Sequence, residues 1–233
     1  MSRFYAIGVG PGDPELLTRK AERVLRNADV VLAPVSSPTE VSVALETIKE
    51  FLDDNRQEII IHQFPMTSDK SVLVPAWQEA AAMIANRVAS GKDVAFITIG
   101  DPLLYSTFIY LLHIFRDTYP NVEIEIVPGI SSINTAAAAA GIPLAESEEQ
   151  IAIVPATGGI ETIRQALTLN DTVVLLKVKP VYTQIIGLLK EMGLADGAVF
   201  VERVGSTRQK VLKGAVEMEG HQPDYLSLMI IRK

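Results

Sequence analysis

The sequence predicts an α/β protein of two domains, and two observations carry this prediction. Short apolar runs alternate along the chain with longer segments of helical period, which is the pattern of strands joined by crossover helices. Towards the carboxyl end, two strand-like runs follow one another without a helix between them. We therefore expect a first sheet whose strands are mainly parallel and a second sheet that is mixed.

The predicted strands are compact apolar runs, as buried strands of parallel sheets require. They span residues 3–9, 29–33, 58–62, 93–99, 122–127, 150–154, 172–178 and 198–201. The two final runs, residues 209–216 and 225–231, are joined by Gly-His-Gln-Pro and are expected to form an antiparallel edge of the second sheet.

The predicted helices carry apolar residues three and four positions apart. They span residues 15–27, 39–52, 75–90, 103–117, 132–140, 160–167 and 181–192. Pro75 is placed in the first turn of its helix, where proline is tolerated, and Gly91 ends that helix. The turn-rich stretch 117–121 predicts the boundary between two domains, residues 1–118 and 119–233.

Composition excludes several functional classes. The 233 residues include no cysteine, which removes thiol catalysis and thiolate metal sites and suits a reducing compartment, so we expect a cytoplasmic protein. Three scattered histidines and a net charge of −7 argue against a histidine metal site and against nucleic-acid binding. The first apolar run ends too early for a signal peptide, and prolines and glycines interrupt the uncharged stretch 126–145, so no membrane association is expected.

Three glycine-containing loops each follow a predicted strand and precede a predicted helix. They read Gly8-Val-Gly-Pro-Gly-Asp-Pro14, Gly100-Asp-Pro-Leu-Leu-Tyr105 and Val127-Pro-Gly-Ile-Ser-Ser132. The carboxyl ends of parallel strands meet at the edge of a sheet where open α/β proteins bind ligands. Each loop alone is compatible with a simple turn, but three at equivalent strand ends predict a shared pocket.

The first loop departs from a dinucleotide-binding fingerprint. Its glycines are spaced G-x-G-x-G, Pro11 removes a backbone N–H, and Asp13 places a negative charge where a pyrophosphate would bind. Phosphate binding is therefore disfavoured, and a turn with Asp13 as a helix cap is the alternative to a binding role. A nicotinamide-dependent oxidoreductase and a non-enzymatic small-molecule sensor remain the alternatives from other functional classes.

The three loops in this order, over residues 3 to about 231, resemble the tetrapyrrole methylase family. This resemblance implies a class III S-adenosylmethionine methyltransferase: two α/β domains with S-adenosylmethionine bound between them, S-adenosylhomocysteine as product, a tetrapyrrole substrate and a homodimer. The stretches 28–34, 64–70 and 175–177 favour the branch that methylates the C(20) meso carbon of precorrin-2 or cobalt-factor II in cobalamin biosynthesis. Methylation of another tetrapyrrole position, or of a protein or RNA, is the alternative within the superfamily.

The resemblance also implies contacts to the cofactor. They fall on Pro11, Ile99, Gly100, Asp101, Leu104, Ser131, Ser132, Leu176, Val204 and Gly205. Asp101 is the main candidate for a catalytic residue, through positioning and electrostatics, and a cap on a helix that begins at Pro102 is the alternative. No protein-bound metal is expected, since cobalt would arrive inside the substrate.

The carboxylates of a tetrapyrrole require a local basic patch on this acidic chain. Lys177 is expected to bind substrate and to act in catalysis, because it follows the apolar run 173–176 at its carboxyl end, and Arg203 is a second candidate. The aperiodic stretch 63–74 predicts either a lid over the substrate or a surface loop. Further expected substrate contacts are Met66, Thr67, Ser68 and Tyr225, whereas Trp77 and Tyr105 are expected to pack in the core.

Overall fold

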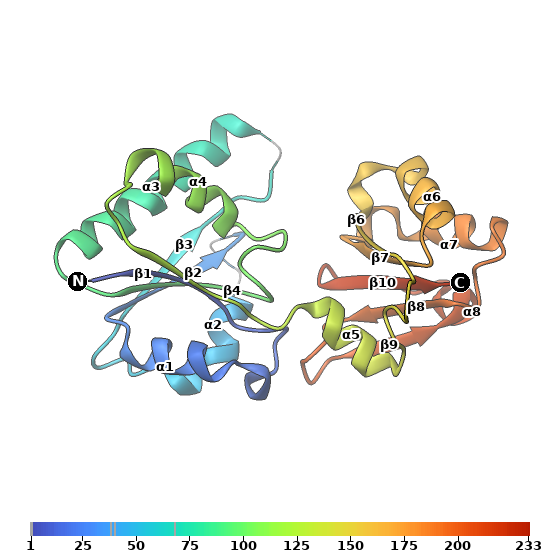
Figure 1. Cartoon of the computed structure of the whole chain (residues 1–233), viewed down its shortest axis with the longest axis horizontal. Helices are drawn as coiled ribbons and strands as arrows, with labels where there is room; N and C mark the ends of the chain where they lie inside the picture. Colours follow the sequence, from blue (N-terminus) through green and yellow to red (C-terminus); the bar gives the residue numbers. More distant parts are fainter. Residues whose placement is uncertain (1, 38, 40, 68) are drawn as a thin grey trace. The chain divides into compact units, whose positions relative to one another are not determined.

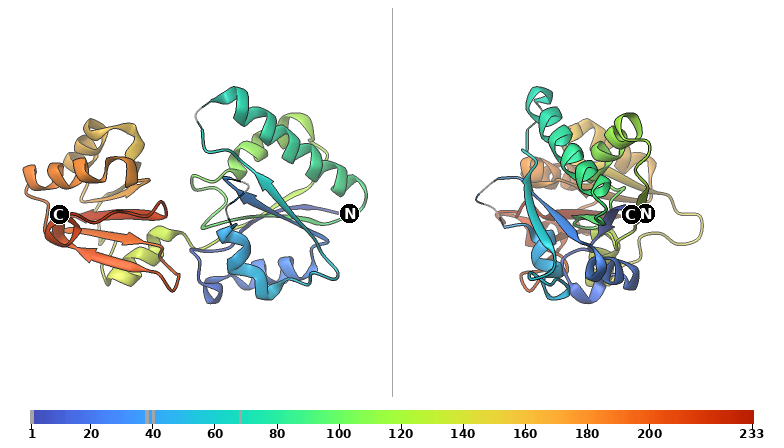
Figure 2. Two further views of the ribbon diagram at one scale, coloured as in Figure 1. Left: turned by 180° about the vertical axis from the view of Figure 1, so that it is seen from behind. Right: turned by 90° about the vertical axis from the view of Figure 1, so that its left-hand side faces the viewer.

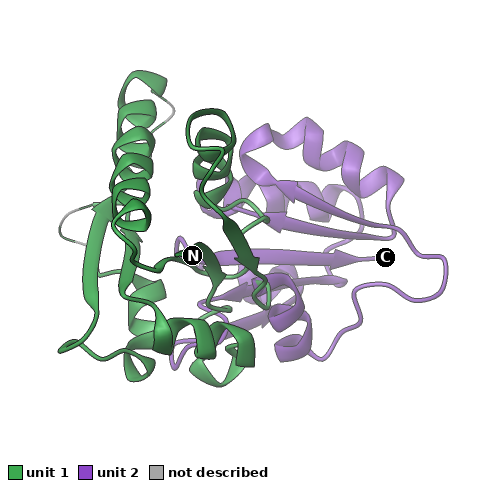
Figure 3. Cartoon of the chain, turned by 60° about the vertical axis from the view of Figure 1, so that its left-hand side comes forward, with its two compact units in different colours: residues 1–131 green, residues 132–233 purple. Residues whose placement is uncertain are grey.

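A computed structural model describes residues 2–37, 39, 41–67 and 69–233, and its contacts divide the chain into two compact units, Met1–Ser131 and Ser132–Lys233 (Figure 3). The turn-rich stretch predicted a division after residue 118, but the division lies after Ser131. The reason is β5 (Ile124–Val127), which pairs in parallel with β1 (Phe4–Gly8) and so completes the first sheet.

The first unit contains a five-stranded sheet in the order β3-β2-β4-β1-β5 (Figure 1). Every pairing between these strands is parallel, which confirms the prediction for the first sheet. The remaining strands are β2 (Val30–Val35), β3 (Glu58–Gln63) and β4 (Val94–Thr98).

Helices cover both faces of the first sheet, as Figure 2 shows from behind. They are α1 (Arg19–Asn27), α2 (Val43–Ile48), α3 (Lys70–Ala89) and α4 (Phe108–Thr118), with 3₁₀ turns at Pro14–Leu16 and Lys49–Phe51. Alternate strand residues face opposite layers. Phe96 packs in the cluster that includes α3 and α4, whereas its neighbour Ile97 packs in the cluster that includes α1 and α2.

Several helices begin elsewhere than the pattern predicts, and side-chain caps decide the first residue of α1 and α3. Thr18 caps α1 by accepting a hydrogen bond from the amide of Ala21 at 3.2 Å, so this helix starts at Arg19 and not at residue 15. Asp69 caps α3, which starts at Lys70 and carries Pro75 in its interior, so the predicted start at Pro75 is wrong. The start of α4 at Phe108 leaves residues 103–107 in the preceding loop.

The second unit contains a mixed sheet in the order β6-β7-β10-β8-β9, which confirms the prediction of a mixed second sheet. Its strands are β6 (Ile151–Pro155), β7 (Thr172–Leu176), β8 (Ala198–Glu202), β9 (Lys210–Lys213) and β10 (Ser227–Arg232). The last two strands do not form the expected antiparallel edge together. Instead, β10 lies between β7 and β8, antiparallel to both, and β9 pairs with β8.

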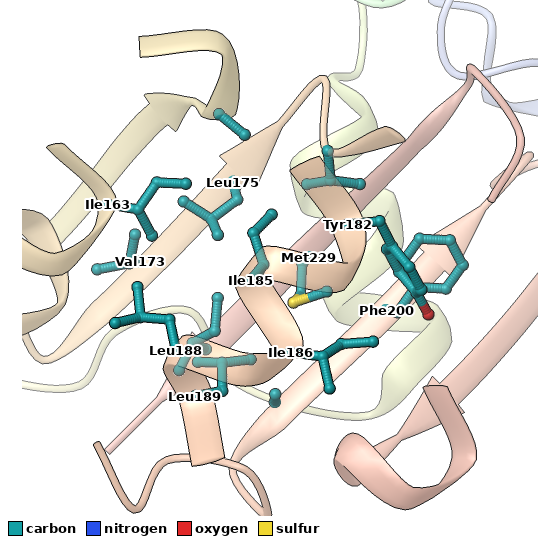
Figure 4. Close-up of a cluster of buried hydrophobic side chains, with 14 of the residues drawn as sticks. Ile163, Val173, Leu175, Tyr182, Ile185, Ile186, Leu188, Leu189, Phe200 and Met229 are labelled. Carbon is teal, nitrogen blue, oxygen red and sulfur yellow. The ribbon is translucent and has the colours of Figure 1, made fainter. Parts of the chain in front are cut away.

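The helices of the second unit are α5 (Ser132–Ala140), α6 (Ile160–Leu169), α7 (Tyr182–Glu191) and α8 (Gly214–Met218), with 3₁₀ turns at Ala156–Gly158 and Lys179–Val181. The short α8 follows β9, where no helix was predicted. Figure 4 shows the core between the sheet and α6 and α7, where Leu175, Phe200 and Met229 meet Ile185 and Leu189. Within the described part of the chain, no helix combines the length and apolar character needed to cross a membrane.

Candidate functional site

The three glycine loops come together at the carboxyl edge of the first sheet through their backbones. A methyl group placed on Gly8 would lie 2.4 Å from the carbonyl oxygen of Gly100 and 2.6 Å from the amide nitrogen of Gly129. One placed on Gly129 would lie 2.1 Å from that same oxygen. The amide of Gly100 also donates a hydrogen bond of 2.7 Å to the carbonyl of Gly10. Only glycine permits this approach of the three backbones.

Gly100 is buried and crowds its neighbours on one side, but space remains beside its α-carbon on the other. Its φ is +72°, a conformation that favours glycine, and a methyl group added to its α-carbon would meet no described atom within 4 Å. A ligand can therefore approach the backbone at Gly100 more closely than it could approach any residue with a side chain. This open side fits a group that is bound by backbone contacts at the strand ends.

Asp101 ties the second loop to the third. Its Oδ1 accepts a hydrogen bond from the Leu103 amide at 2.9 Å, and its Oδ2 accepts one from the Gly129 amide at 3.1 Å. The alternative expectation, a cap on a helix that begins at Pro102, is wrong: the carboxylate caps a turn within the loop, and α4 begins only at Phe108. Because an ionised carboxylate has about four acceptor positions, Asp101 keeps capacity for a ligand.

The charges of the three loops suit a cation and disfavour a phosphate. Residues 8–17, 99–107 and 127–132 contain no lysine and no arginine, and their acidic residues are Asp13, Glu15 and Asp101. Asp13 itself accepts the Glu15 amide at 2.9 Å and so occupies a donor that a phosphate nest would need. The S-adenosylmethionine implied by the resemblance has a positive sulfonium and no phosphate, so the residues present fit this cofactor.

The other predicted residues of the first unit have unequal surroundings. Pro11 is buried, and Ile99, Leu104 and Ser131 are half-buried in the loops at the same edge. Met66 is 61% exposed and Thr67 is exposed in the stretch before α3, whereas Ser68 lies outside the described residues. Because α3 starts at Lys70, the second half of the predicted lid is helical.

Two aromatic residues predicted for the core behave differently. Trp77 packs against the core and stacks on Tyr110, with ring centroids 4.1 Å apart, as expected. Tyr105 is 46% exposed and has a φ of +53°, so the expectation that it packs in the core is wrong. It lies in the loop before α4, since the helix begins later than predicted.

In the second unit, two predicted cations occupy equivalent places at the strand ends. Lys177 directly follows β7 and Arg203 directly follows β8, and these strands flank β10. Both residues have positive φ, +57° for Lys177 and +47° for Arg203. Non-glycine residues rarely adopt this conformation, and they concentrate at functional sites where the surroundings hold them.

A network of polar side chains, which the sequence reading missed, surrounds Arg203. Its Nε and Nη2 donate to Oδ2 of Asp224 at 2.7 and 2.5 Å, and the Asp224 amide donates to Oε2 of Glu202 at 3.0 Å. His221 lies 3.0 Å from the same Glu202 oxygen, and the Lys210 ammonium lies 3.3 Å from its other ring nitrogen. Because that ammonium can only donate, Nε2 of His221 carries the hydrogen bound by Glu202.

Charge and burial set the ionisation of this network. Partial burial opposes ionisation of Asp224, but the Leu226 amide, the Arg203 guanidinium and the Lys179 charge outweigh it and lower the pKa of Asp224. Burial, together with the nearby Glu202 carboxylate, raises the pKa of Tyr182 to about 12. Around neutral pH, Asp224 is therefore an anion and Tyr182 is a neutral phenol that donates to the Met218 carbonyl at 3.1 Å.

The remaining predicted residues of the second unit lie at or near the same edge. Leu176 is half-buried at the end of β7, Val204 is buried after Arg203, and the Gly205 amide donates to Oε1 of Gln209 at 2.9 Å. Tyr225 is 48% exposed in the segment before β10, and Ser132 is the first residue of α5. The predicted residues that the structure describes thus lie at the carboxyl edge of the sheet in each unit, with Met66 and Thr67 in the segment that follows β3, whereas Ser132 begins α5.

Two depressions of the described chain involve none of the predicted site residues, although one adjoins the network beside Arg203 through Tyr182 and His221. No three histidine, aspartate or glutamate side chains of the described chain converge as a metal site would require. One depression of 440 Å³ is lined by residues of α2 and of the segment that leads into β3, and another of 270 Å³ by residues of α7 and the segment 219–222. Neither is lined by a predicted site residue.

Comparisons with known proteins match nearly the whole chain. A family model described as tetrapyrrole (corrin/porphyrin) methylases matches residues 3–218. The cobalt-precorrin-2 C(20)-methyltransferase of Salmonella typhimurium is 34% identical over 232 residues, which cover 99% of this chain and 96% of that protein. A probable cobalt-precorrin-2 C(20)-methyltransferase of Methanocaldococcus jannaschii is 36% identical over 242 residues, with 100% and 97% covered.

Solved structures share the fold at lower identity. The X-ray structure of a cobalt precorrin-4 methyltransferase matches with a TM-score of 0.75 at 21% identity, covering 99% of this chain and 94% of that chain. The uroporphyrin-III C-methyltransferase of Thermus thermophilus, complexed with S-adenosylhomocysteine, matches with a TM-score of 0.71 at 24% identity and covers 99% of this chain and 92% of its own. Both likenesses agree with one parallel and one mixed sheet.

Proposed function

The chain belongs to the tetrapyrrole (corrin/porphyrin) methylases and is an S-adenosylmethionine-dependent methyltransferase, and within this family we propose that it methylates the C(20) meso carbon of cobalt-bearing precorrin-2. The observation that carries this proposal is that two relatives aligned over nearly the whole chain have this activity in their names. Both names specify the cobalt-bearing substrate, which favours it over metal-free precorrin-2. Family membership rules out the alternative of a nicotinamide-dependent oxidoreductase.

The two sheet edges suit the two reactants of such a transfer. When bound, S-adenosylmethionine supplies an electrophilic methyl group on a sulfonium and leaves as S-adenosylhomocysteine. The acidic, glycine-lined edge of the first unit offers backbone contacts at Gly100 and an opposing charge at Asp101. Lys177 and Arg203 at the edge of the second unit are suited to bind carboxylates of the tetrapyrrole.

The work of the protein is mainly orientation. Holding two reactants in a reactive geometry contributes up to roughly 7–11 kcal/mol in favourable intramolecular models. Asp101 serves this purpose by fixing the loop at Gly100 to the loop at Gly129. We propose that Pro11, Ile99, Leu104, Ser131, Ser132, Leu176, Val204 and Gly205 complete the cofactor contacts, and that Met66, Thr67, Ser68 and Tyr225 contact the substrate.

A methyl-transfer assay tests the proposal. The chain is incubated with carbon-13-methyl S-adenosylmethionine and, in separate arms, with cobalt-precorrin-2, metal-free precorrin-2 and uroporphyrinogen III. We expect transfer to the cobalt-bearing substrate, with the label located at C(20) by nuclear magnetic resonance. A label at another carbon, or transfer to uroporphyrinogen III alone, would overturn the C(20) assignment. Transfer to the cobalt-bearing substrate would also contradict a protein or RNA as the methyl acceptor.

The homodimer and the cytoplasmic location remain predictions. The molar mass in solution tests the homodimer.

A further inference from the structure

We infer that Asp224 is a positioning residue, which holds the Arg203 guanidinium at the carboxyl edge of the second sheet for a carboxylate of the tetrapyrrole. The inference rests on the proposed function, because it takes Arg203 to be a substrate contact. Asp224 itself need not touch the substrate. It acts by fixing the position and orientation of the cation that does.

Arg203 is fixed at both its backbone and its side chain. Its amide donates to the Leu226 carbonyl at 2.7 Å, which fastens the turn after β8 to the segment before β10. Its Nε and Nη2 share one oxygen, Oδ2 of Asp224. Since a guanidinium has five N–H groups in a rigid plane, this pairing leaves donors for a second carboxylate.

Asp224 is in turn fixed by its own contacts. Its Oδ1 accepts the Leu226 amide at 3.0 Å, its backbone carbonyl accepts the Ser227 hydroxyl at 2.6 Å, and its amide donates to Glu202 at 3.0 Å. Glu202 is the last residue of β8, and its side chain is only 13% exposed. The carboxylate that orients Arg203 is therefore anchored to the central strands of the sheet.

The partial burial of the pair distinguishes it from an ordinary surface salt bridge. The side chains of Arg203 and Asp224 are 25% and 27% exposed. In the same unit, Arg164 makes a two-pronged pair with Glu191, both bonds being 2.9 Å, on the outer surface of α6 and α7. Those side chains are 34% and 63% exposed, and no strand end is involved. This second pair is a matched control, since it has the same chemistry away from the proposed site.

The experiment compares Asp224→Asn with Glu191→Gln in steady-state assays with cobalt-precorrin-2. Asparagine keeps the size of Asp224 and an acceptor for the Leu226 amide, but it removes the negative charge facing Arg203. We expect Asp224→Asn to raise the KM for the tetrapyrrole roughly tenfold, with kcat and the Kd for S-adenosylhomocysteine within about threefold of the parent. Glu191→Gln should leave KM unchanged.

Two further variants separate the possible failures. Arg203→Ala should raise KM at least as much as Asp224→Asn, and the double variant should be no worse than Arg203→Ala alone. If Arg203→Ala leaves KM unchanged, Arg203 is not a substrate contact and that part of the proposed function fails. If Arg203→Ala raises KM but Asp224→Asn does not, the positioning inference alone is wrong. If Asp224→Asn does not fold, Asp224→Glu takes its place. Because this variant keeps the negative charge, its KM for the tetrapyrrole must stay within about threefold of the KM of the parent.

Discussion

The carboxyl edges of the two sheets differ in composition: glycine backbones form the first, and charged side chains form the second. In the first unit the edge consists of glycine backbones in close contact, with Asp101 as a clip between two loops. In the second unit the edge carries two long charged side chains, Lys177 and Arg203, and Asp224 holds the second of them. At Gly8 and Gly129 this backbone edge leaves no room for an added methyl group, whereas an edge of side chains can be altered one charge at a time. Substitutions of Gly8 or Gly129 should therefore abolish function together with folding, and substitutions of the charged residues at the second edge should change substrate binding in a fold that remains intact.

The largest effect is expected from Gly129→Ala. Its methyl group would lie 2.1 Å from the Gly100 oxygen and 2.7 Å from the Gly8 carbonyl carbon, and neither backbone atom can rotate away. We expect a loss of at least about 3 kcal/mol in the free energy of unfolding, and loss of S-adenosylhomocysteine binding in any folded fraction. Denaturant unfolding and calorimetric titration measure the two effects.

Gly187→Ala is the matched control for that substitution. Gly187 lies inside α7, where an added methyl group would meet nothing within 4 Å. Alanine there should raise stability by about 0.5–1 kcal/mol, because glycine is unfavourable within a helix. If Gly129→Ala were tolerated as well as Gly187→Ala, the contrast between the two edges would be lost.

An intermediate effect is expected from Lys177→Gly, which should increase stability but weaken substrate binding. Glycine adopts the observed φ of +57° without the steric cost of a side chain, so the free energy of unfolding should rise by about 1 kcal/mol. The KM for the tetrapyrrole should rise several-fold, because a cation is lost. Ser147→Gly, at a φ of +49° in an exposed loop, should give the gain in stability without the change in KM. An unchanged KM for Lys177→Gly would remove Lys177 from the site.

The smallest effect concerns a charge cluster at the other edge of the first sheet. At the start of β3, hydrogen bonds and charge from Arg87 and Lys92 lower the pKa of Glu58 despite partial burial. A lowered carboxyl pKa stabilises the fold above the unfolded-state pKa near 4, and this contribution is lost progressively as the pH falls from there through the lower folded-state pKa. The three side chains are 27–48% exposed, so we expect a contribution below about 1 kcal/mol.

Glu58→Gln measures this contribution directly. The melting temperature of the variant should be slightly below that of the parent at pH 7, and the difference should disappear by about pH 3. Its KM should not change, in contrast to Asp224→Asn. A difference in melting temperature that stayed constant from pH 7 to pH 3 would contradict the assignment of the effect to ionised Glu58.

The sequence predicts the layers and the strand-end loops well, because both follow from local patterns. The apolar run before Lys177 marks a strand end, so this cation could be placed without a structure. Helix starts were less predictable, since single caps at Thr18 and Asp69 decide them and the interior Pro75 resembles a first-turn proline. The partner of Arg203 was missed because Asp224 lies 21 positions further along the chain, and only the path of the segment through β9 and α8 brings it back to the end of β8.

The central position of β10 has a consequence for biosynthesis. The first unit is complete once residue 131 has left the ribosome, and its sheet needs nothing that follows. In the second unit, β7 and β8 share no pairing and are joined only through residues 227–232. Until those residues emerge, the nascent chain exposes two unpaired apolar strand edges, which are sites for chaperone binding or aggregation. Translation speed over the last strand should therefore affect the yield of folded enzyme.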